Sequence, residues 1–387
     1  MKHISAIFAL LSVCVLPLLN GCGGGRTAAV SLGDTIYSPR FAEGFAILGD
    51  GESSVLSVRN PWQGAEDVEF NLFLKRSGEE PPAGFSGVVV DAPLKSVVCM
   101  SSSYVAFIDA VGAVDAVKGV SGISYITNDS IRARHARGLV RDVGYDANLN
   151  YEVVAEMRPD LVLIYGLQGD NSAVTRKLDE LGIKYMYIGD YVEQSPLGRA
   201  EWIVAFGEMF DKRGVAESVF DSVRSSYEKT REEIAALSML ISSNRPKVML
   251  NAPYKDTWFV PGDRSYMVQL INDAQGYYAC AGVDSDQSRP ISGESAFVAA
   301  SGSDVWLNPG QVSTKAELVV QNPKFAEIGP VQRNRVYNSN KRSTPEGGSD
   351  FWESGAVRPD IVLKDLVKIL YPRCLPGYEL YYYKKVE

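Results

Sequence analysis

A pattern that occurs twice limits the folds open to this chain of 387 residues. The segments NYEVVAEMRPDLVLIYG (150–166) and ESAFVAASGSDVWLNPG (294–310) each read as a helix, an aspartate, a short apolar run and a glycine. Asp160 and Asp304 hold the same place in the two segments. A continuous apolar run next to a helix is typical of a strand buried in a parallel sheet. The repeat therefore predicts two α/β lobes of similar build.

Short apolar runs and helical patterns alternate around both segments. In the first half, the pattern predicts strands at 96–100 (SVVCM), 116–120 (AVKGV) and 161–165, and a helix followed by a strand over 171–190. In the second half, it predicts strands at 247–253 (KVMLNAP), 257–262 and 335–338, and helices at 265–276 and 358–372. Ligands of such open α/β sheets bind beyond the carboxyl ends of the strands. We therefore expect a ligand cleft between the lobes.

Residues 214–243 carry apolar side chains at helical spacing, which predicts one long helix. Its roughly 28 residues, at about 1.5 Å each, span on the order of 40 Å, the width of a lobe. Residues 28–92 instead alternate apolar and polar residues around turn sequences, and they predict a small β-meander. The predicted fold class is α/β, with two doubly wound lobes joined by a long backbone helix and a small N-terminal β-rich segment. The predicted divisions are 28–92 (β-rich segment), 93–198 (lobe one), 199–245 (connecting helical region) and 246–387 (lobe two with a C-terminal helix).

The first 22 residues predict export and a lipid anchor. Lys2 and His3 precede an apolar stretch from 4 to 19, which has the length of a signal-peptide core and is short for a membrane span. Leu-Asn-Gly-Cys at 19–22 resembles the lipobox of bacterial lipoproteins, in which the cysteine becomes the lipidated first residue. We expect a signal peptide at 1–21, a lipid on Cys22 and a tether at 22–27, on the periplasmic side of a bacterial membrane. The alternative is an ordinary secretory signal with an incidental cysteine.

Composition argues against several classes of function. The formal charge of -8 is unlike that of a nucleic-acid-binding protein. With His3 in the signal, His135 is the one remaining histidine, so a histidine-based metal cluster is excluded. His135 lies in the basic stretch IRARHARG, which is typical of a solvated surface. The sequence contains no GxxxxGK[ST], HExxH, paired CxxC or GxSxG motif. Cys99, Cys280 and Cys374 allow one disulfide at most, and their state stays open.

Over roughly 95–372 the chain resembles the substrate-binding proteins of ABC importers for vitamin B12 and ferric siderophores. VGYDANLNYEVVAEMRPDLVLIYG (143–166) and the helical stretch before RPKVML (245–250) carry the resemblance. The β-rich segment and the ending YYYKKVE depart from the commonest members. The resemblance implies a rigid helical backbone, a small closure on binding, a metal chelate as ligand and a membrane permease as partner. It implies no enzymatic activity and no resident cofactor; we further expect a monomer that binds no nucleic acid.

The loops that follow the predicted strands supply the candidate ligand-binding residues. Aromatic side chains among them suit the flat faces of a macrocycle or chelate. The candidates are Ser102, Ser103, Tyr104, Tyr125, Gly166, Leu167, Tyr191, Tyr254, Trp258, Asn308 and Trp352. In the family that the chain resembles, an acidic residue on each lobe pairs with permease arginines, and Glu294 and Asp170 are the candidates by position.

Two questions stay open at the level of the sequence. If Arg132, Arg134, Arg137 and Arg141 face the cleft, an anionic ferric siderophore is favoured. If they form a solvated face, a corrinoid or a neutral siderophore fits equally well. Two other classes of function also remain: a cell-surface receptor or adhesin that uses the β-rich segment, and an enzyme on the same two-lobed scaffold.

Overall fold

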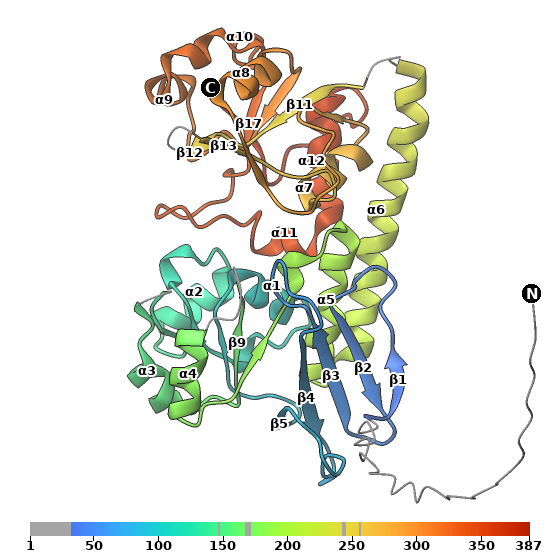
Figure 1. Ribbon diagram of the computed structural model, residues 1–387, viewed down its shortest axis with the longest axis vertical. Helices are drawn as coiled ribbons and strands as arrows, with labels where there is room; N and C mark the ends of the chain where they lie inside the picture. The colour runs from blue at the N-terminus through green and yellow to red at the C-terminus, as the bar shows by residue number, and fades with distance from the viewer. Residues whose placement is uncertain (1–31, 146–147, 167–171, 242–244, 255–256) are drawn as a thin grey trace, which may run out of the picture.

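The computed structural model describes residues 32–145, 148–166, 172–241, 245–254 and 257–387. Two lobes lie at opposite ends of the long helix α6 (Arg213–Ile241), which runs along one side of both (Figure 1). The signal peptide, Cys22 and the tether lie outside the described residues. Within the described ranges, no helix has the length and apolarity needed to cross a membrane.

Lobe one is built on a parallel sheet of five strands in the order β10-β9-β6-β7-β8. Its strands are β6 (Val97–Cys99), β7 (Val117–Val120), β8 (Arg141–Asp142), β9 (Leu161–Ile164) and β10 (Tyr185–Tyr187). Its helices are α1 (Ser102–Ala110), α2 (Asp129–Ala136), α3 (Tyr151–Met157), α4 (Ser172–Glu180) and α5 (Pro196–Met209). Short 3-10 turns lie at Val114–Ala116, Ile123–Tyr125 and Asp190–Val192. The predicted strands at 96–100, 116–120 and 161–165 correspond to β6, β7 and β9.

Lobe two carries a second five-stranded sheet in the order β14-β11-β16-β17-β18, parallel except for its last pair. Its strands are β11 (Lys247–Leu250), β14 (Tyr277–Tyr278), β16 (Val305–Leu307), β17 (Val336–Asn338) and β18 (Lys384–Lys385). Its helices are α7 (Tyr266–Asp273), α8 (Gly293–Ser301), α9 (Lys315–Gln321), α10 (Gly329–Gln332), α11 (Ser354–Val357) and α12 (Pro359–Leu370). A 3-10 turn lies at Pro323–Glu327.

The predicted strand at 257–262 is present but lies outside the main sheet of lobe two. It forms β13 (Thr257–Val260), between β12 (Pro253–Tyr254) and β15 (Arg289–Ile291) in a small antiparallel sheet. Alternate side chains of a strand face opposite sides, so Trp258 and Val260 both turn into the core of the lobe while Phe259 is exposed.

Asp160 and Asp304, the two aspartates of the repeated pattern, make equivalent hydrogen bonds in the two lobes. The Asp160 carboxylate accepts the backbone N–H groups of Lys95 (2.7 Å) and Ser96 (2.9 Å), which lead into β6. Asp304 accepts the N–H of Lys247 (2.8 Å), the first residue of β11. In both lobes, the strand after the aspartate pairs in parallel with the strand that the aspartate holds. In each lobe, the aspartate at the start of one strand therefore also fixes the start of the neighbouring parallel strand, β6 in lobe one and β11 in lobe two.

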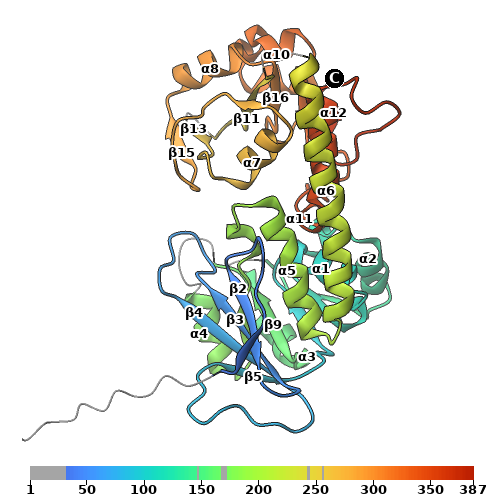
Figure 2. The same cartoon turned by 90° about the vertical axis from the view of Figure 1, so that its right-hand side faces the viewer.

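The N-terminal segment forms a five-stranded sheet, β1 to β5 in chain order. Its strands are β1 (Asp34–Tyr37), β2 (Phe45–Gly49), β3 (Ser54–Arg59), β4 (Glu69–Lys75) and β5 (Val88–Asp91). The first four form the predicted meander, and β5 adds in parallel to β4. The sheet lies beside lobe one (Figure 2), and its apolar face shares one hydrophobic core with α1 and α5 of that lobe. Phe45 packs on Trp202 of α5 with ring centroids 5.0 Å apart.

The predicted fold class is confirmed: two α/β lobes are joined by a long helix, and a β-rich segment precedes them. The predicted helix at 214–243 corresponds to α6. Helix α5 begins at Pro196 and packs within lobe one, where Phe206 stacks on Phe107 at 4.9 Å. Helix α5 also contacts α7, α11 and α12 of lobe two, so α5 and α6 both take part in the helical connection between the lobes.

Candidate functional site

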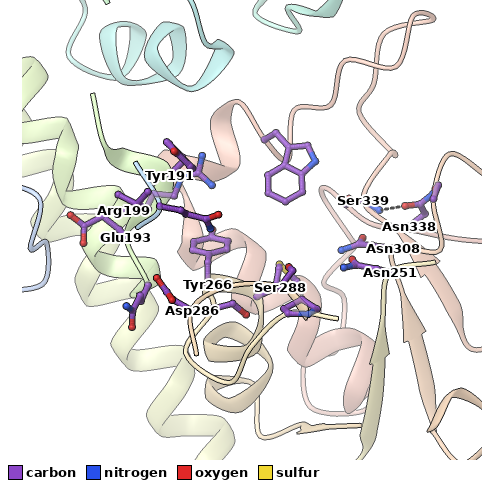
Figure 3. Close-up of a pocket in the computed structure, with 18 of the residues that line it drawn as sticks. Tyr191, Glu193, Arg199, Asn251, Tyr266, Asp286, Ser288, Asn308, Asn338 and Ser339 are labelled. Carbon is purple, nitrogen blue, oxygen red and sulfur yellow. Dashed lines mark hydrogen bonds between the residues drawn. The ribbon is translucent and has the colours of Figure 1, made fainter. Parts of the chain in front are cut away.

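A cavity of about 420 Å³ lies between the lobes (Figure 3). Both lobes contribute to its wall, and so does the N-terminal sheet. The lining residues are Gln63, Tyr191, Val192, Glu193, Gln194, Arg199, Asn251, Pro261, Ser265, Tyr266, Met267, Asp286, Ser288, Asn308, Gly310, Gln311, Asn338, Ser339 and Trp352. We call this cavity the cleft. Its wall combines aromatic rings with amide and hydroxyl groups, a combination typical of small-molecule sites.

Three asparagines mark the lobe-two side of the cleft. Asn251 follows β11, Asn308 follows β16 and Asn338 ends β17, and these three parallel strands are neighbours in the sheet. Their carboxyl ends therefore meet at one edge, as expected for a ligand site on an open α/β sheet. Asn251 and Asn308 adopt positive φ angles of 62° and 55°, a conformation that asparagine tolerates better than most residues. Figure 3 shows the three amides on one side of the cleft.

Two polar atoms in this wall are buried without a hydrogen-bond partner. They are the Ser265 hydroxyl and the Asn308 Oδ1. The Asn308 amide nitrogen has only a long contact, 3.4 Å, to the Tyr383 hydroxyl. Leaving a buried polar group unsatisfied is unfavourable by about 1–3 kcal/mol, and a hydrogen bond from a bound water or a ligand would remove that penalty.

A buried ion pair forms the lobe-one side. Arg199 of α5 contacts Asp190 (3.2 Å), whose side chain is only 1 % exposed. Burial raises the pKa of Asp190, and the Arg199 guanidinium and a hydrogen bond from Ser103 oppose that rise. Arg199 also lies over the ring of Tyr266 of lobe two, 5.4 Å from its centroid. This cation–π contact joins the lobes at the cleft.

Tyr191 and Glu193 continue the lobe-one wall. The Tyr191 hydroxyl donates to the carbonyl oxygen of Gly166, and burial raises the pKa of Tyr191 to about 12. The Glu193 carboxylate accepts the indole N–H of Trp202 (2.9 Å) and the backbone N–H of Gly44 (2.9 Å). Burial raises the pKa of Glu193, and these hydrogen bonds oppose the rise.

The charges in the cleft favour ligands that are not anionic. Among the lining residues that the structure describes, Arg199 is the one cation, and Asp190 already pairs with it. Glu193 and Asp286 add two carboxylates. Within the described ranges, no group of three or more His, Cys, Asp or Glu side chains is placed to hold a metal ion. The wall is therefore suited to an uncharged or cationic ligand recognised through hydrogen bonds and aromatic faces.

The structure brings three predicted site residues together in the cleft: Tyr191, Asn308 and Trp352. The Trp352 indole is 49 % exposed and packs edge-on against Phe351 at 4.7 Å. Gly166 lies next to the cleft through its hydrogen bond with Tyr191. Leu167 lies outside the described residues.

The other predicted ligand residues lie away from the cleft. Ser103 and Tyr104 are buried in lobe one behind Asp190, and Ser102 is half-buried at the start of α1. Trp258 is 2 % exposed and packs on Trp306 at 5.7 Å, because the alternation along β13 turns it into the core. Tyr125 and Tyr254 lie on the surface and line no part of the cleft.

The basic run does not face the cleft. Arg134 pairs with Asp115 and Arg141 pairs with Glu156. Arg132 and Arg137 are exposed on or next to α2, and none of the four lines the cleft. Arg134 is buried within lobe one, so only part of the run is solvated, and the alternative in which the arginines face the cleft is not met by the described residues. Of the predicted docking residues, Glu294 is exposed in the first turn of α8, and Asp170 lies outside the described residues.

Several lining residues were not predicted. Asn338 had a signal in the sequence, since it ends a predicted strand (RVYN), and Asn308 directly follows one (DVWL). Asn251 lies inside the predicted strand 247–253, and only the end of β11 at Leu250 places it at the edge of the sheet. Arg199 and Tyr266 carry no such signal, because each lies on a helix and reaches the cleft through the packing of the lobes. Gln63 belongs to the N-terminal sheet, whose position the sequence does not specify.

Residues 97–342 match the periplasmic binding protein family. The match covers well over half of the chain. The chain belongs to this family. The resemblance found in the sequence is thereby confirmed at the level of the family.

The curated relatives of the chain include lipoproteins. An uncharacterized lipoprotein of Methanocaldococcus jannaschii is 25 % identical, over 100 % of this chain and 97 % of the relative. An uncharacterized ABC transporter substrate-binding lipoprotein of Bacillus subtilis is 26 % identical, over 51 % of this chain and 60 % of the relative.

The solved structures that share the fold include a heme binding protein and a vitamin B12 binding protein. A periplasmic heme binding protein from Pseudomonas aeruginosa has a TM-score of 0.57 and 19 % identity, covering 76 % of this chain and 98 % of that one. The periplasmic vitamin B12 binding protein of Vibrio cholerae has a TM-score of 0.51 and 15 % identity, covering 72 % of this chain and 97 % of that one. Both are binding proteins.

Proposed function

We propose that this chain is the substrate-binding lipoprotein of an ABC importer. It captures a metal chelate in the cleft and delivers it to a membrane permease. The observation that carries the proposal is the cleft itself, with two buried polar atoms in its wall that lack a partner. The family match, the lipoprotein relatives and the ABC importer relative support the same role. Binding rather than catalysis is proposed because the family and the structural neighbours are binding proteins.

The charges in the cleft narrow the proposed ligand. Heme carries two propionates and many siderophores are anionic, and such ligands are favoured by arginines that are free to pair with them. Here the cleft arginine already pairs with a buried aspartate, and two further carboxylates lie in the wall. Amide and hydroxyl groups make up most of the remaining polar lining. The proposed ligand is therefore an uncharged or cationic chelate, namely a corrinoid or a hydroxamate-type ferric siderophore.

Anchoring and docking complete the proposal. A lipid on Cys22 confines the protein to the outer face of the membrane that holds its permease, which raises the effective concentration of one for the other. Glu294 is exposed on lobe two and is proposed as one docking residue. Asp170 is proposed as its counterpart on lobe one. The protein acts as a monomer and has no resident cofactor, since the metal arrives with the ligand.

Tryptophan fluorescence tests the proposed function. Trp352 is the half-exposed indole in the cleft, whereas Trp202, Trp258 and Trp306 are fully buried. The chain with Cys22→Ser, which cannot be lipidated, would be titrated with cyanocobalamin, cobinamide, ferrichrome and ferrioxamine B, and also with heme and ferric citrate. We expect submicromolar binding of at least one of the first four probes, verified by calorimetry, and weak or no binding of the two anionic probes.

A variant at Trp352 tests whether this tryptophan produces the change in fluorescence. Trp352→Phe should keep the calorimetric affinity within a few fold and lose most of the fluorescence change. Binding of heme or ferric citrate alone would contradict the proposed charge class. If the protein binds none of the six probes, the result contradicts the proposed function.

A further inference from the structure

A second cavity of about 380 Å³ opens from the cleft toward the N-terminal sheet. The two cavities share five lining residues: Gln63, Val192, Glu193, Gln194 and Asp286. The rest of the second wall comes entirely from the N-terminal sheet and its loops: Glu43, Gly44, Arg59, Asn60, Trp62, Gly64 and Ala65. We call this cavity the side chamber. Its N-terminal wall lies outside residues 97–342, the part of the chain that matches the family.

The loop between β3 and β4 is held firmly in place. Asn60 and Val68 close its base, since the N–H of Asn60 donates to the Val68 carbonyl (2.9 Å) and the Val68 N–H donates to the Asn60 side chain (3.0 Å). At its tip, Trp62 packs on Tyr187 of lobe one at 5.1 Å and on Phe70 at 6.0 Å. The loop is therefore part of the wall of lobe one and presents the exposed Gln63 to both cavities.

The cleft residues themselves depend on this sheet. Tyr191 receives a hydrogen bond from the backbone of Gln63. The Glu193 carboxylate accepts the N–H groups of Glu43 (3.1 Å) and Gly44 (2.9 Å). The N-terminal sheet thus positions two side chains of the cleft and also walls the side chamber. In Figure 2 the loops at the upper end of the sheet point toward lobe two.

The side chamber is polar and carries more negative than positive charge. Its wall holds the carboxylates of Glu43, Glu193 and Asp286 and the guanidinium of Arg59. Within the part of the chain that the structure describes, neither Asp286 nor Arg59 makes a side-chain ion pair. Asp286 belongs to lobe two, so it faces the N-terminal sheet from across the cleft. A hydrogen-bond donor or a cation in this chamber would contact both lobes and the sheet.

We propose that the N-terminal sheet adds a second compartment to the ligand site, and that the side chamber receives a hydrogen-bond-donating or cationic arm of the chelate whose body occupies the cleft. This inference rests on the proposed function. It assigns the β-rich segment a role in specificity, because a chelate that lacks such an arm makes no contact with Asp286, the chamber carboxylate that has no ion-pair partner within the described ranges.

Two variants and their matched controls test the side chamber. Ala65→Trp fills it, and Ala136→Trp adds the same side chain at an exposed position of α2. Asp286→Asn removes one carboxylate, and Asp284→Asn alters an exposed neighbour on the same loop that pairs with Arg264. Calorimetry would measure the affinity of all five proteins, wild type included, for cyanocobalamin, cobinamide, ferrichrome, ferrioxamine B and N-acetylated ferrioxamine B. Thermal unfolding would show that each variant folds.

Among the probes that carry an arm and that wild type binds, we expect Ala65→Trp to lower the affinity for each at least tenfold. Both control variants should keep their affinities within twofold of wild type. Asp286→Asn should lower the affinity for ferrioxamine B, which has a pendant ammonium, more than the affinity for its acetylated form. If wild type binds a corrinoid, the same variant should lower the affinity for that corrinoid about fivefold. If wild type binds a probe and both Ala65→Trp and Asp286→Asn bind it with unchanged affinity, the inference is wrong and the proposed function is unaffected. If wild type binds none of the five probes, both the proposed function and this inference are wrong.

Discussion

Glu353 shows what burial does to a single residue between the lobes. Its side chain is 2 % exposed and accepts the backbone N–H of Thr127 of lobe one (2.8 Å). Burial raises its pKa from 4.5 to about 7, and the nearby Asp350 carboxylate adds to the rise. Asp350 itself pairs with Arg342 (2.5 Å). The carboxyl of Glu353 therefore takes up a proton near neutral pH in the folded chain.

This shift predicts how stability depends on pH. Between pH 4.5 and about 7 the folded chain holds a proton on Glu353 that the unfolded chain releases. The contribution of Glu353 to stability is present below pH 4.5 and is lost as the pH rises through 7, by about 3 kcal/mol at most. Glu353→Gln, which cannot ionise, should be more stable than wild type at pH 8 and lose that advantage at pH 4.5. Urea unfolding across this range checks it.

Glu346→Gln is the matched control, since Glu346 is exposed on the same loop. Its stability should follow the wild-type pH profile throughout. If Glu353→Gln also follows the wild-type profile, Glu353 does not titrate in this range in the folded chain.

The location of a single residue can be predicted from the sequence where its position relative to a strand decides whether its side chain is exposed. Asn308 directly follows a buried strand, so its place at the edge of the sheet could be predicted. Trp258 and Trp352 look alike in the sequence, as aromatic residues near predicted loops. The difference lies in their neighbours: Trp258 shares a strand face with Val260, which is buried, whereas Trp352 lies in an irregular segment before α11.

Helix α5 is the element that holds the N-terminal sheet. Glu201, near its middle, has a fully buried carboxylate that accepts four hydrogen bonds from the chain around β1 and β2. The donors are the Tyr37 hydroxyl (2.8 Å) and the N–H groups of Arg40 (2.9 Å), Phe41 (2.8 Å) and Ala42 (2.9 Å). One residue before its end, Glu208 accepts a hydrogen bond from the Ser54 hydroxyl (2.6 Å) and pairs with Arg76 (3.1 Å). The sheet is therefore fixed to lobe one by carboxylates as well as by apolar packing.

Removing the Glu201 carboxylate should loosen this sheet first. Glu201→Ala leaves three backbone N–H groups without an acceptor, so we expect the free energy of unfolding to fall by about 3–5 kcal/mol. Amide hydrogen exchange should accelerate over 34–59 more than in lobe two. Glu217→Ala is the control, because the Glu217 carboxylate is about half exposed on α6 and pairs with Arg213 at 3.6 Å. Equal exchange rates in the two variants would contradict the role of Glu201.

At the scale of elements, local pattern predicted the strands of the N-terminal segment but not their place. Alternating residues and turn sequences are local features, and they indicate a meander. The contacts that position the meander join residues about 160 apart in the chain, such as Phe41 and Glu201. A single sequence holds no signal for such a pairing, and the side chamber follows from that pairing. This is why the role of the β-rich segment could not be predicted.

The molecule as a whole holds its lobes together at more than one place. Helix α6 packs on α5 of lobe one and on α12 of lobe two. A second connection is the loop 340–350, which we call the strap, and it is drawn in orange-red between the lobes in Figure 1. At its end, Gly348 lies against the backbone of Tyr125 in lobe one. The strap then leads into Trp352 of the cleft and Glu353 of the lobe interface.

Gly348 predicts how closely the geometry of the cleft depends on the strap. A Cβ atom added there would lie 2.1 Å from the carbonyl oxygen of Tyr125, a backbone atom that cannot move aside alone. Gly348→Ala should therefore displace the strap from lobe one and with it Trp352. We expect a larger radius of gyration by small-angle X-ray scattering and at least tenfold weaker binding of whichever of cyanocobalamin, cobinamide, ferrichrome and ferrioxamine B the wild type binds.

The neighbouring residue separates loss of the lobe contact from strain in the strap itself. Gly347 has a φ of 97° and open space around its Cβ position. Gly347→Ala therefore adds the same methyl group and a backbone penalty of about 1 kcal/mol or more, without a clash against lobe one. It should lower stability while the radius of gyration and the ligand affinity stay close to wild type. If the two alanine variants behave alike in scattering and binding, the strap does not set the distance between the lobes.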